Sequence, residues 1–479
     1  MECRLRALKA CPPSEELLER HLNSLPDTLY ETYERMLEDL PAPDYTQRML
    51  RVLCGAMRPL TIEELIDAIA IVGTNPPRFD MKSRLKDLDA IQDVCPGLIE
   101  LNRDLAIDKV IGCVCQGPIT VSLGHFSVQE YLESERICQR QSVACFAINP
   151  RKSHTRMARI CLTFLLEPKV LRDEDPLEIL SKFPFFGYAA HYWPNHFGLA
   201  ENKDLLMGQV LRLFRNERRS FEIWRKIYNS GGTMRIMEIP PSPIYCASFF
   251  GLDSLLVELM GENRSSLPSL LNEPMGHWGS ALGAAVFMDE GNTVQVLLEN
   301  GADANTTVPN FAWHLSRSAL YHALRHGRLR IAQLLIDGGA DVSAKNQDGR
   351  TLLHIVSMGD RAETTEFLLA NGVDVNAKDK DGQTALHLAV SYANAKAVRL
   401  LLAENADIDA QDKYGQTALH LAGSVLDNTE VELSELLIQN GASLHLKTIL
   451  GLTPLQVPSS RNWPLRNHAP HPHVRRRAS

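Results

Sequence analysis

Apolar residues recur with a helical period in several short stretches of the C-terminal half of the chain. The stretches "IAQLLI", "TEFLLA", "AVRLLLA" and "LSELLIQ" each predict a short amphipathic helix. The segments "GRTLLHIV" and "GQTALHLA", the latter present twice, alternate with these helices. Their threonines, Thr351, Thr384 and Thr417, stand 33 residues apart. A fixed period of this length indicates a solenoid in which each repeat is a pair of helices.

Glycines mark where each repeat turns. Asp-Gly pairs at 348–349 and 381–382 precede the first helix, and they predict tight turns in which glycine takes a positive φ. Gly372 and Gly441 follow the second helix and predict a left-handed stop. Weaker units begin at Ser280 and Ser318, an eroded first unit begins at Ser242, and "GLTPLQV" from Gly451 starts a last one.

This combination of motifs and period resembles the ankyrin repeat. The resemblance implies that the threonine hydroxyl, with the histidine three residues later, ties the turn to the helix and to the next unit. We therefore interpret His354, His387 and His420 as structural, because a solenoid separates them by roughly 10 Å per unit and they cannot share a metal ion. The second unit has Gly283 in place of this histidine, so we expect it to be looser. Extra residues after His420 predict a longer loop.

The N-terminal half reads as helix, helix, strand, strand. A helix entered through Ser24 and Pro26 is followed by "RPLTIEELIDAIAI", in which Thr61 and Glu64 form a capping box and start a helix at Ile62. The stretch "LKDLDAIQDVCPGLIELN" predicts a helix that leads into a strand. In "ITVSLGHFSVQEYL", a strand turns at Gly124 into a short helix, for which Ser127 and Glu130 suggest a second capping box. This order is typical of a winged helix.

These stretches resemble the segment that follows the NACHT nucleotide-binding domain in fungal NLR-type proteins. The closest matches are "SLPDTLYETYERML", "RPLTIEELIDAIAI", "GHFSVQEYL", "ARICLTFLL" and "PFFGYAAHYWPNHF", and the resemblance runs from about Leu5 to Val457. It implies a winged helix of the GPI inositol-deacylase type, which in the family regulates the nucleotide domain. We expect a mostly α-helical protein with a helical and winged-helix module at 1–140, a helical linker domain at 141–238, about six ankyrin repeats at 239–457 with degenerate ends, and a basic disordered tail at 458–479.

The NTPase that defines the family is missing from the sequence. There is no G-x-x-x-x-G-K-[ST] loop to cradle phosphates, so we expect no nucleotide and no cofactor. The chain is either a relative without a NACHT domain or a fragment that begins after it. The poor match to a terminal capping repeat also suggests an abnormal C-terminal end.

Catalytic motifs are missing as well. Neither a G-x-S-x-G elbow nor an H-E-x-x-H motif occurs, and His125 beside Ser127 has no third group to orient it. We therefore predict no enzyme activity, no catalytic residues and no metal site.

Charge and composition indicate in which compartment the protein lies and which classes of partner it is not expected to bind. The net charge of −8 gives no electrostatic footprint for nucleic acid, and the "IEELIDAIAI" helix is acidic and apolar. The uncharged run at 110–129 contains polar residues and predicts strands rather than a membrane helix. Ten scattered cysteines without C-x-x-C indicate reduced thiols in a cytoplasmic protein. The arginine-rich tail at 475–477 leaves a nuclear address, a kinase site at Ser479 or no role open.

The predicted function is protein binding on the concave face of the solenoid, at hairpin tips and at the exposed side of the first helices. Tyr392 and Tyr414, about one unit apart on one face, are the expected anchors, with lysines around them. The full set is Lys345, Gln347, Met358, Lys378, Lys380, Asp381, Gln383, Tyr392, Gln411, Lys413, Tyr414 and Gln416. Two function classes remain: the sensor half of an NLR-type immunity or non-self recognition protein, and a cytosolic adaptor or substrate receptor unrelated to immunity.

Overall fold

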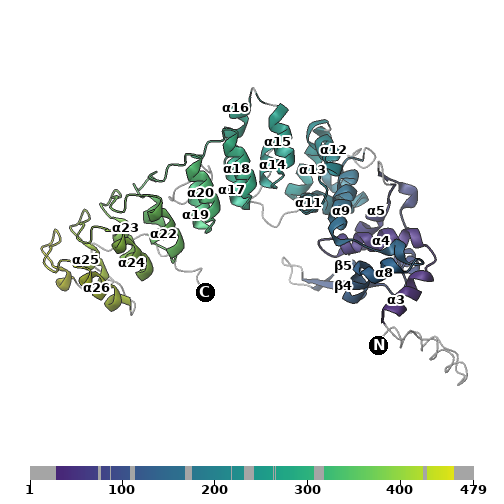
Figure 1. Ribbon diagram of the computed structural model, residues 1–479, viewed down its shortest axis with the longest axis horizontal. Helices are drawn as coiled ribbons and strands as arrows, with labels where there is room; N and C mark the ends of the chain where they lie inside the picture. Colours follow the sequence, from purple (N-terminus) through teal and green to yellow (C-terminus); the bar gives the residue numbers. More distant parts are fainter. Residues whose placement is uncertain are drawn as a thin grey trace, which may run out of the picture. The chain divides into compact units, whose positions relative to one another are not determined.

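The computed structural model describes residues 29–457 apart from 74–76, 87, 108–113, 168–174, 217, 231–241, 263, 265, 307–317 and 424–428. The chain forms two compact units, Met1–Pro241 and Ser242–Ser479 (Figure 1). The expected boundary between residues 238 and 239 lies close to this division, whereas the expected boundary at residue 140 falls inside the first unit. Among the described residues, every helix is too short or too polar to span a bilayer.

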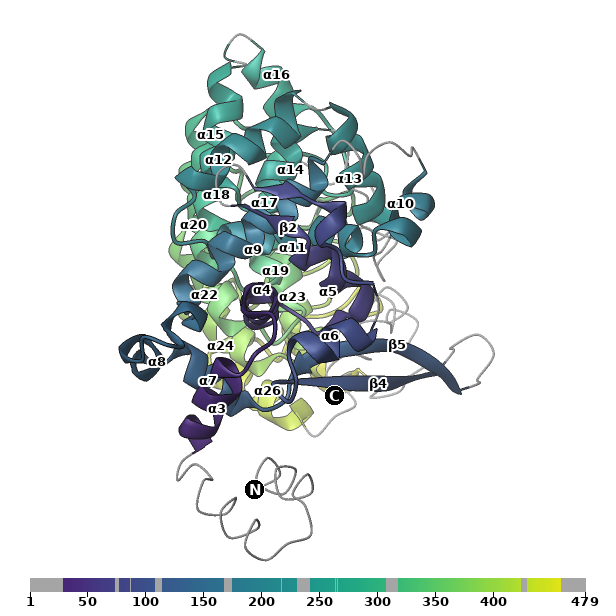
Figure 2. The same ribbon diagram turned by 90° about the vertical axis from the view of Figure 1, so that its right-hand side faces the viewer.

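The first part of unit 1 has the order of elements that the sequence predicts for a winged helix. The antiparallel sheet has the strand order β1-β5-β4, and β4 and β5 form a long hairpin that is visible in Figure 2. The elements are α3 (Leu29–Glu38), α4 (Pro43–Gly55), β1 (Leu60–Thr61), α5 (Ile62–Ile69), β2 (Ile71–Val72), β3 (Arg78–Phe79), α6 (Leu88–Val94), β4 (Ile99–Ile107), β5 (Val114–Leu123), α7 (Phe126–Glu133) and α8 (Glu135–Gln139).

Of the two predicted capping boxes, one is confirmed and one is wrong. Helix α5 begins at Ile62, because Thr61 Oγ1 accepts the Glu64 amide at 3.2 Å and Glu64 Oε2 accepts the Thr61 amide at 2.9 Å. Helix α7, however, begins at Phe126 with His125 as its N-cap. The His125 ring reaches the free Ser127 amide at 3.2 Å, so the helix starts before the predicted serine cap.

The rest of unit 1 is an all-helical segment around an aromatic core. Helix α11 packs against α9 and α13. Trp193 of α11 lies 5.9 Å from Trp224 of α13 between ring centroids, and the Trp224 indole donates to the Ala190 carbonyl at 2.9 Å. The helices are α9 (Pro150–Leu165), α10 (Pro176–Lys182), α11 (Phe185–Gly198), α12 (Asp204–Leu211) and α13 (Arg218–Ser230).

Unit 2 contains six helix pairs within its described residues, as the sequence predicts. The first helices of successive pairs stack on one another. The pairs are α14 (Pro243–Phe249) with α15 (Asp253–Glu262), α17 (Ala281–Met288) with α18 (Gly291–Glu299), α19 (Ala319–Arg325) with α20 (Leu329–Asp337), α21 (Leu352–Ser357) with α22 (Ala362–Ala370), α23 (Ala385–Ser391) with α24 (Ala395–Ala403), and α25 (Ala418–Ala422) with α26 (Thr429–Gln439).

Two local features of unit 2 depart from a regular repeat. An additional helix, α16 (Leu267–Asn272), lies between the first and second pairs. At Gly283, a Cβ atom would lie 2.0 Å from the Trp278 carbonyl oxygen, so the second unit has no room for the usual histidine. The long loop predicted after His420 falls largely on residues 424–428, and the basic tail on 458–479; both lie outside the described residues.

Candidate protein-interaction surface

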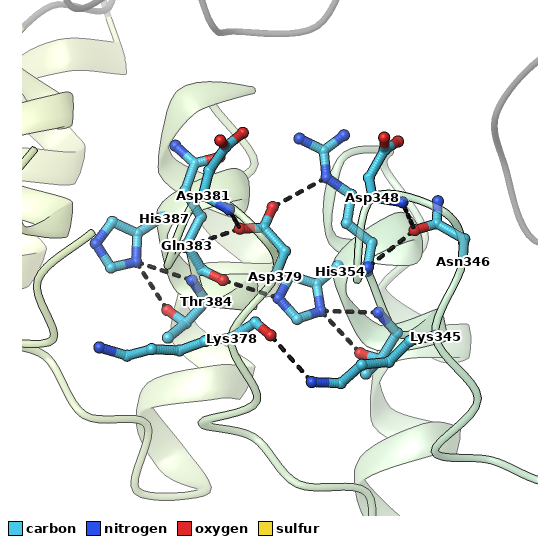
Figure 3. Close-up of polar contacts among 12 residues, drawn as sticks. Lys345, Asn346, Asp348, His354, Lys378, Asp379, Asp381, Gln383, Thr384 and His387 are labelled. Carbon is cyan, nitrogen blue, oxygen red and sulfur yellow. Dashed lines mark hydrogen bonds and ion pairs between the residues drawn. The ribbon is translucent and has the colours of Figure 1, made fainter. Parts of the chain in front are cut away.

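The three regular repeats share one polar connection from each repeat to the next. His354 Nδ1 accepts the Thr351 amide at 3.2 Å and lies 2.8 Å from Thr351 Oγ1, while its Nε2 lies 3.0 Å from the Gln383 carbonyl oxygen (Figure 3). His387 makes the same contacts with Thr384 and with the Gln416 carbonyl. His420 likewise bonds Thr417 and reaches the Leu452 carbonyl at 3.2 Å.

This geometry fixes the tautomer of each histidine. Nδ1 accepts a backbone N–H, so the ring proton is on Nε2, where it is donated to the following repeat. Burial lowers the pKa of His387 to about 4, and burial is also the main cause of the lowered pKa values of His354 and His420. The rings are therefore neutral at pH 7. The prediction that these histidines tie the turn to the helix and to the next unit is confirmed.

Each hairpin tip is the turn that precedes a first helix, at 345–350, 378–383 and 411–416. The side chain of its second residue holds it in shape. Asn346 Oδ1 accepts the amides of Asp348 and Arg350, both at 2.9 Å. Asp379 and Asp412 accept the amides two and four residues later in the same way. Because one oxygen satisfies two amides, the tip keeps its shape without a partner.

Adjacent tips are joined through their backbones. The Lys380 amide donates to the Asp348 carbonyl at 2.9 Å, and the Lys413 amide donates to the Asp381 carbonyl at 2.8 Å. Gly382 has a φ of +74°, and a Cβ added there would lie 3.0 Å from the Lys413 nitrogen. Glycine is thus required both for the turn and for the close approach of the next tip.

Lysine side chains add a second set of connections between tips. Lys345 Nζ donates to the Lys378 carbonyl at 3.1 Å (Figure 3). Lys378 Nζ donates in the same way to the Gln411 carbonyl at 3.0 Å. Lys413 forms an ion pair with Asp381, whose hydrogen bond raises the pKa of Lys413. The Lys380 ammonium group, by contrast, makes no hydrogen bond or ion pair with a described residue.

A buried ion pair, which the sequence does not reveal, lies under the tips. Arg350 Nε lies 3.1 Å from Asp379 Oδ2, and their side chains are 9% and 1% exposed. The available signal was the recurrence of Asn or Asp at 346, 379 and 412, which keeps the 33-residue spacing of the threonines. That recurrence marks the residue that holds each tip. Arg350, which belongs to the preceding repeat, neutralises the charge of one of them, Asp379.

The predicted contact residues fall into two groups. The tips carry one group, in which the lysines and Gln347 are exposed and the others are half-buried: Lys345, Gln347, Lys378, Lys380, Asp381, Gln383, Gln411, Lys413 and Tyr414. The second group, Met358 and Tyr392, forms the C-caps of α21 and α23. Since the tips lie at the other end of these helices, seven residues of α23 separate the two groups by roughly 10 Å.

Two details of the predicted surface therefore need correction. Tyr392 and Tyr414 do not lie side by side, because Tyr414 is in the tip that contacts Asp381, ahead of α23, whereas Tyr392 ends that helix. Gln416 is only 3% exposed, and its carbonyl already accepts from His387 and from the Asp412 amide. Gln416 is therefore not part of the exposed surface, and the two tyrosines occupy separate positions on it.

Within the described ranges, no group of three or more His, Cys, Asp or Glu residues is arranged to hold a metal ion. The surface consists instead of hydrogen-bond donors, cations and an aromatic ring, all carried by tips that are hydrogen-bonded to one another.

Comparison with known protein families agrees with this arrangement. The ankyrin-repeat model matches three times, at residues 282–379, 320–412 and 353–448, and the model of the GPI inositol-deacylase winged helix domain matches residues 33–149. The protein is thus a helical-repeat protein with an N-terminal winged helix. More particularly, it carries a winged helix domain of the GPI inositol-deacylase type followed by an ankyrin-repeat domain, an arrangement that supports a protein-interaction scaffold.

Individual relatives match parts of this architecture. Azaphilone pigments biosynthesis cluster protein L of Monascus ruber is 35% identical over 305 residues, which are 60% of this chain and 63% of that protein. Notch-regulated ankyrin repeat-containing protein of Homo sapiens is 35% identical over 72 residues, 15% of this chain and 62% of that protein. The chain thus spans less than two thirds of the length of either relative. The crystal structure of the ankyrin repeat domain of Bcl-3, described as a unique member of the IkappaB protein family, is similar with 28% identity and a TM-score of 0.41, covering 46% of this chain and 95% of that one.

Proposed function

We propose that the ankyrin repeats recognise a partner protein through the hairpin tips, and that the chain is the sensor half of an NLR-type non-self recognition protein. The proposal rests on the hydrogen bonds that hold the tips between residues 346 and 451 in place. Hydrogen bonds within and between the tips fix their shape before any partner arrives. A preorganised surface loses less entropy on binding than a flexible one.

The charge of the tips favours a partner with acidic groups. Lys345 and Lys378 are exposed, although each already donates one hydrogen bond to the neighbouring tip. An ammonium group has three donors, so further donors remain for a partner. Lys380 brings its whole ammonium group to the same row of tips. Exposed lysines of this kind raise association rates more than they raise affinity.

A pull-down with the full chain from an extract of the source cells tests the surface. Lys380→Glu should reduce recovery of the partner and slow its association. Lys396→Glu is the matched control, because Lys396 belongs to the same repeat and is exposed but lies on α24, away from the tips. Equal recovery with both variants would rule out the tips as the binding surface.

The separation of the tyrosines allows a second, independent comparison. If the tips alone bind the partner, Tyr414→Ala should weaken binding by about 2 kcal/mol, as expected for an aromatic hot spot. Tyr392→Ala should then have little effect. A loss with Tyr392→Ala alone would move the site to the other end of the first helices, where Met358 also lies.

The immunity role is supported by the order of the domains and by their resemblance to the segment after a NACHT domain. The alternative is an adaptor in a biosynthetic system, which the name of the Monascus ruber relative favours. The identity of the captured protein separates these two. A partner taken from an extract of a foreign strain or organism, and not from the cell's own extract, supports non-self recognition. Capture of the cell's own biosynthetic enzymes supports the adaptor.

A further inference from the structure

A pocket of about 940 Å³ in unit 1 has no part in the proposed protein-binding surface. It lies between α4, β2, α9 and the start of α12. Its volume falls in the range typical of small-molecule sites. Five basic side chains line it: Arg48, Arg51, Lys152, Arg156 and Arg159.

These cations come from two helices that pack against each other. On α9, Lys152, Arg156 and Arg159 are four and three residues apart, which places them on one face of the helix. Arg48 and Arg51 are three residues apart on α4, which contacts α9. Positive charge therefore borders the pocket on two sides, as in a clamp.

The positions of the α4 arginines are fixed by neutral groups. Arg48 donates to the Ile69 carbonyl at 2.7 Å and stacks over the Tyr45 ring at 4.3 Å. Arg51 donates to Gln47 Oε1 at 2.9 Å and to the Cys145 carbonyl at 3.3 Å. These contacts orient the guanidinium groups and leave their charge uncompensated.

Three of the basic lining residues also lack partners of opposite charge. No ion pair involves Arg51, Lys152 or Arg156 among the residues that the structure describes. Arg51 Nε and Thr155 Oγ1 are buried without a hydrogen-bond partner. Burial lowers the pKa of Arg51 and of Arg156, and the next arginine adds to each effect: Arg156 for Arg51, and Arg159 for Arg156. Like charges held together in this way are relieved by a bound anion.

The two acidic lining residues, Asp44 and Glu201, do not balance Arg51, Lys152 and Arg156. Guanidinium forks match the oxygens of phosphate with paired hydrogen bonds, and such bonds are stronger than those between neutral groups. The apolar part of the lining, which includes Ile71, Val72 and Leu205, provides room for the carbon portion of a ligand. We propose that this pocket binds a small molecule that carries two or more phosphate groups.

This pocket differs from the phosphate loop that the sequence lacks. The expectation that no nucleotide binds followed from the missing phosphate loop, which holds phosphates with backbone amides and a lysine. Here the donors are side chains on the faces of two helices, and no loop of that kind is needed. The proposal concerns phosphate recognition and does not specify a nucleoside.

Titration calorimetry of the full chain with inorganic tripolyphosphate, in a buffer without magnesium, tests the proposal. We expect saturable binding that weakens as sodium chloride is raised. Arg156→Gln should weaken binding by about fivefold or more, because it removes a charge-assisted contact. Arg151→Gln is the matched control, since Arg151 is exposed on the same helix but does not line the pocket, and it should change the affinity by less than about twofold.

Thermal melting of both variants checks that each remains folded. No binding at about 1 mM tripolyphosphate would overturn the proposal, because a clamp of five cations should reach at least that affinity. Equal weakening by Arg156→Gln and Arg151→Gln would also overturn it, by showing attraction without a site. Tighter binding of a poly-glutamate peptide that competes with tripolyphosphate would assign the pocket to an acidic protein segment instead.

A vesicle experiment distinguishes the source of the phosphates. Phosphatidylcholine vesicles with and without phosphatidylinositol bisphosphate are sedimented with the protein and with Arg156→Gln. Sedimentation that depends on both the bisphosphate and Arg156 supports a lipid headgroup as the ligand. Tripolyphosphate binding without such sedimentation supports a soluble ligand.

Discussion

The upstream and downstream halves of the ankyrin array have the same helix pairs but hold them together differently. In the downstream half, each Thr–His pair caps its own helix and bonds the next repeat. In the upstream half, Ser242, Ser280 and Ser318 cap their helices through the amide three residues later. The Trp278 ring stacks on Phe287 there, and Arg328 bonds the Val286 carbonyl of the preceding repeat. A single fold thus tolerates both a repeated Thr–His ladder and connections that combine aromatic stacking with individual hydrogen bonds.

The difference has a consequence for stability. Hydrogen bonds between buried groups require a precise geometry, and a broken one leaves a polar group without a partner. Apolar contacts are less directional and adjust to small shifts. The downstream half should therefore be the stiffer half and also the one more sensitive to single substitutions at its polar positions.

The largest effect is expected from the buried ion pair beneath the tips. Arg350→Met should destabilise the downstream repeats by about 3 kcal/mol, because it leaves the Asp379 carboxylate buried without its partner. Lys413→Met breaks an ion pair that is 41% and 32% exposed and should cost less than about 1 kcal/mol. Urea unfolding, followed by hydrogen exchange in peptides from 346 to 416, measures both. Similar losses would mean that burial of the pair does not matter.

Gly382 provides the next test. Gly382→Val should cost about 1–3 kcal/mol, because a β-branched residue is strained at positive φ. Lys380→Ala in the same tip should cost little, since the lysine side chain is exposed. Comparable urea midpoints for the two variants would show that the repeats have a different register.

The buried histidines that connect the repeats, His354, His387 and His420, should also make the downstream half sensitive to acid. The folded-state pKa of His387 is lowered to about 4, so its contribution to stability is complete above about pH 6.5 and is lost as the pH falls toward 4. From pH 7 to pH 5 the loss is about 2 kcal/mol. His387→Gln lowers stability at pH 7 but should remove this part of the pH dependence. An unchanged pH slope in the variant would exclude His387 as its source.

The smallest expected difference compares one cap from each half. Ser318→Ala should cost about 1 kcal/mol, the usual value for an N-cap. Thr384→Ala should cost more by about 1 kcal/mol, because Thr384 Oγ1 also lies 2.9 Å from His387 Nδ1 and helps to orient the ring. Exchange rates of amides in α19 and α23 report the two effects separately. A larger loss in α19 would reverse the order of the two halves.

Features that depend on neighbouring residues could be read from the sequence. The 33-residue period located the helix pairs, and the Thr61–Glu64 spacing located the start of α5. The positive φ of Gly382 followed from its place after aspartate in a turn. These features are local, so residue type and spacing determine them.

Other features depend on the direction of a helix or on residues far apart in the chain. The sequence register predicts one face for Tyr392 and Tyr414, because it does not show at which end of the first helix a residue lies. Burial of Gln416 results from the packing of adjacent tips. The basic pocket joins residues of α4 and α9 that are about a hundred positions apart, so neither half of it forms a motif.

The hydrogen bond between each tip and the next has a mechanical meaning. Each backbone hydrogen bond between successive tips in the downstream half is made by nearly the same atoms, from the Lys380 amide on Asp348 to the Ile449 amide on Tyr414. Identical links in series share an applied load equally and deform by equal amounts. Slight rotations at the individual hydrogen bonds therefore add up along the row and change its curvature. A small bend of the row is therefore spread over all of these hydrogen bonds, and no single one carries it alone.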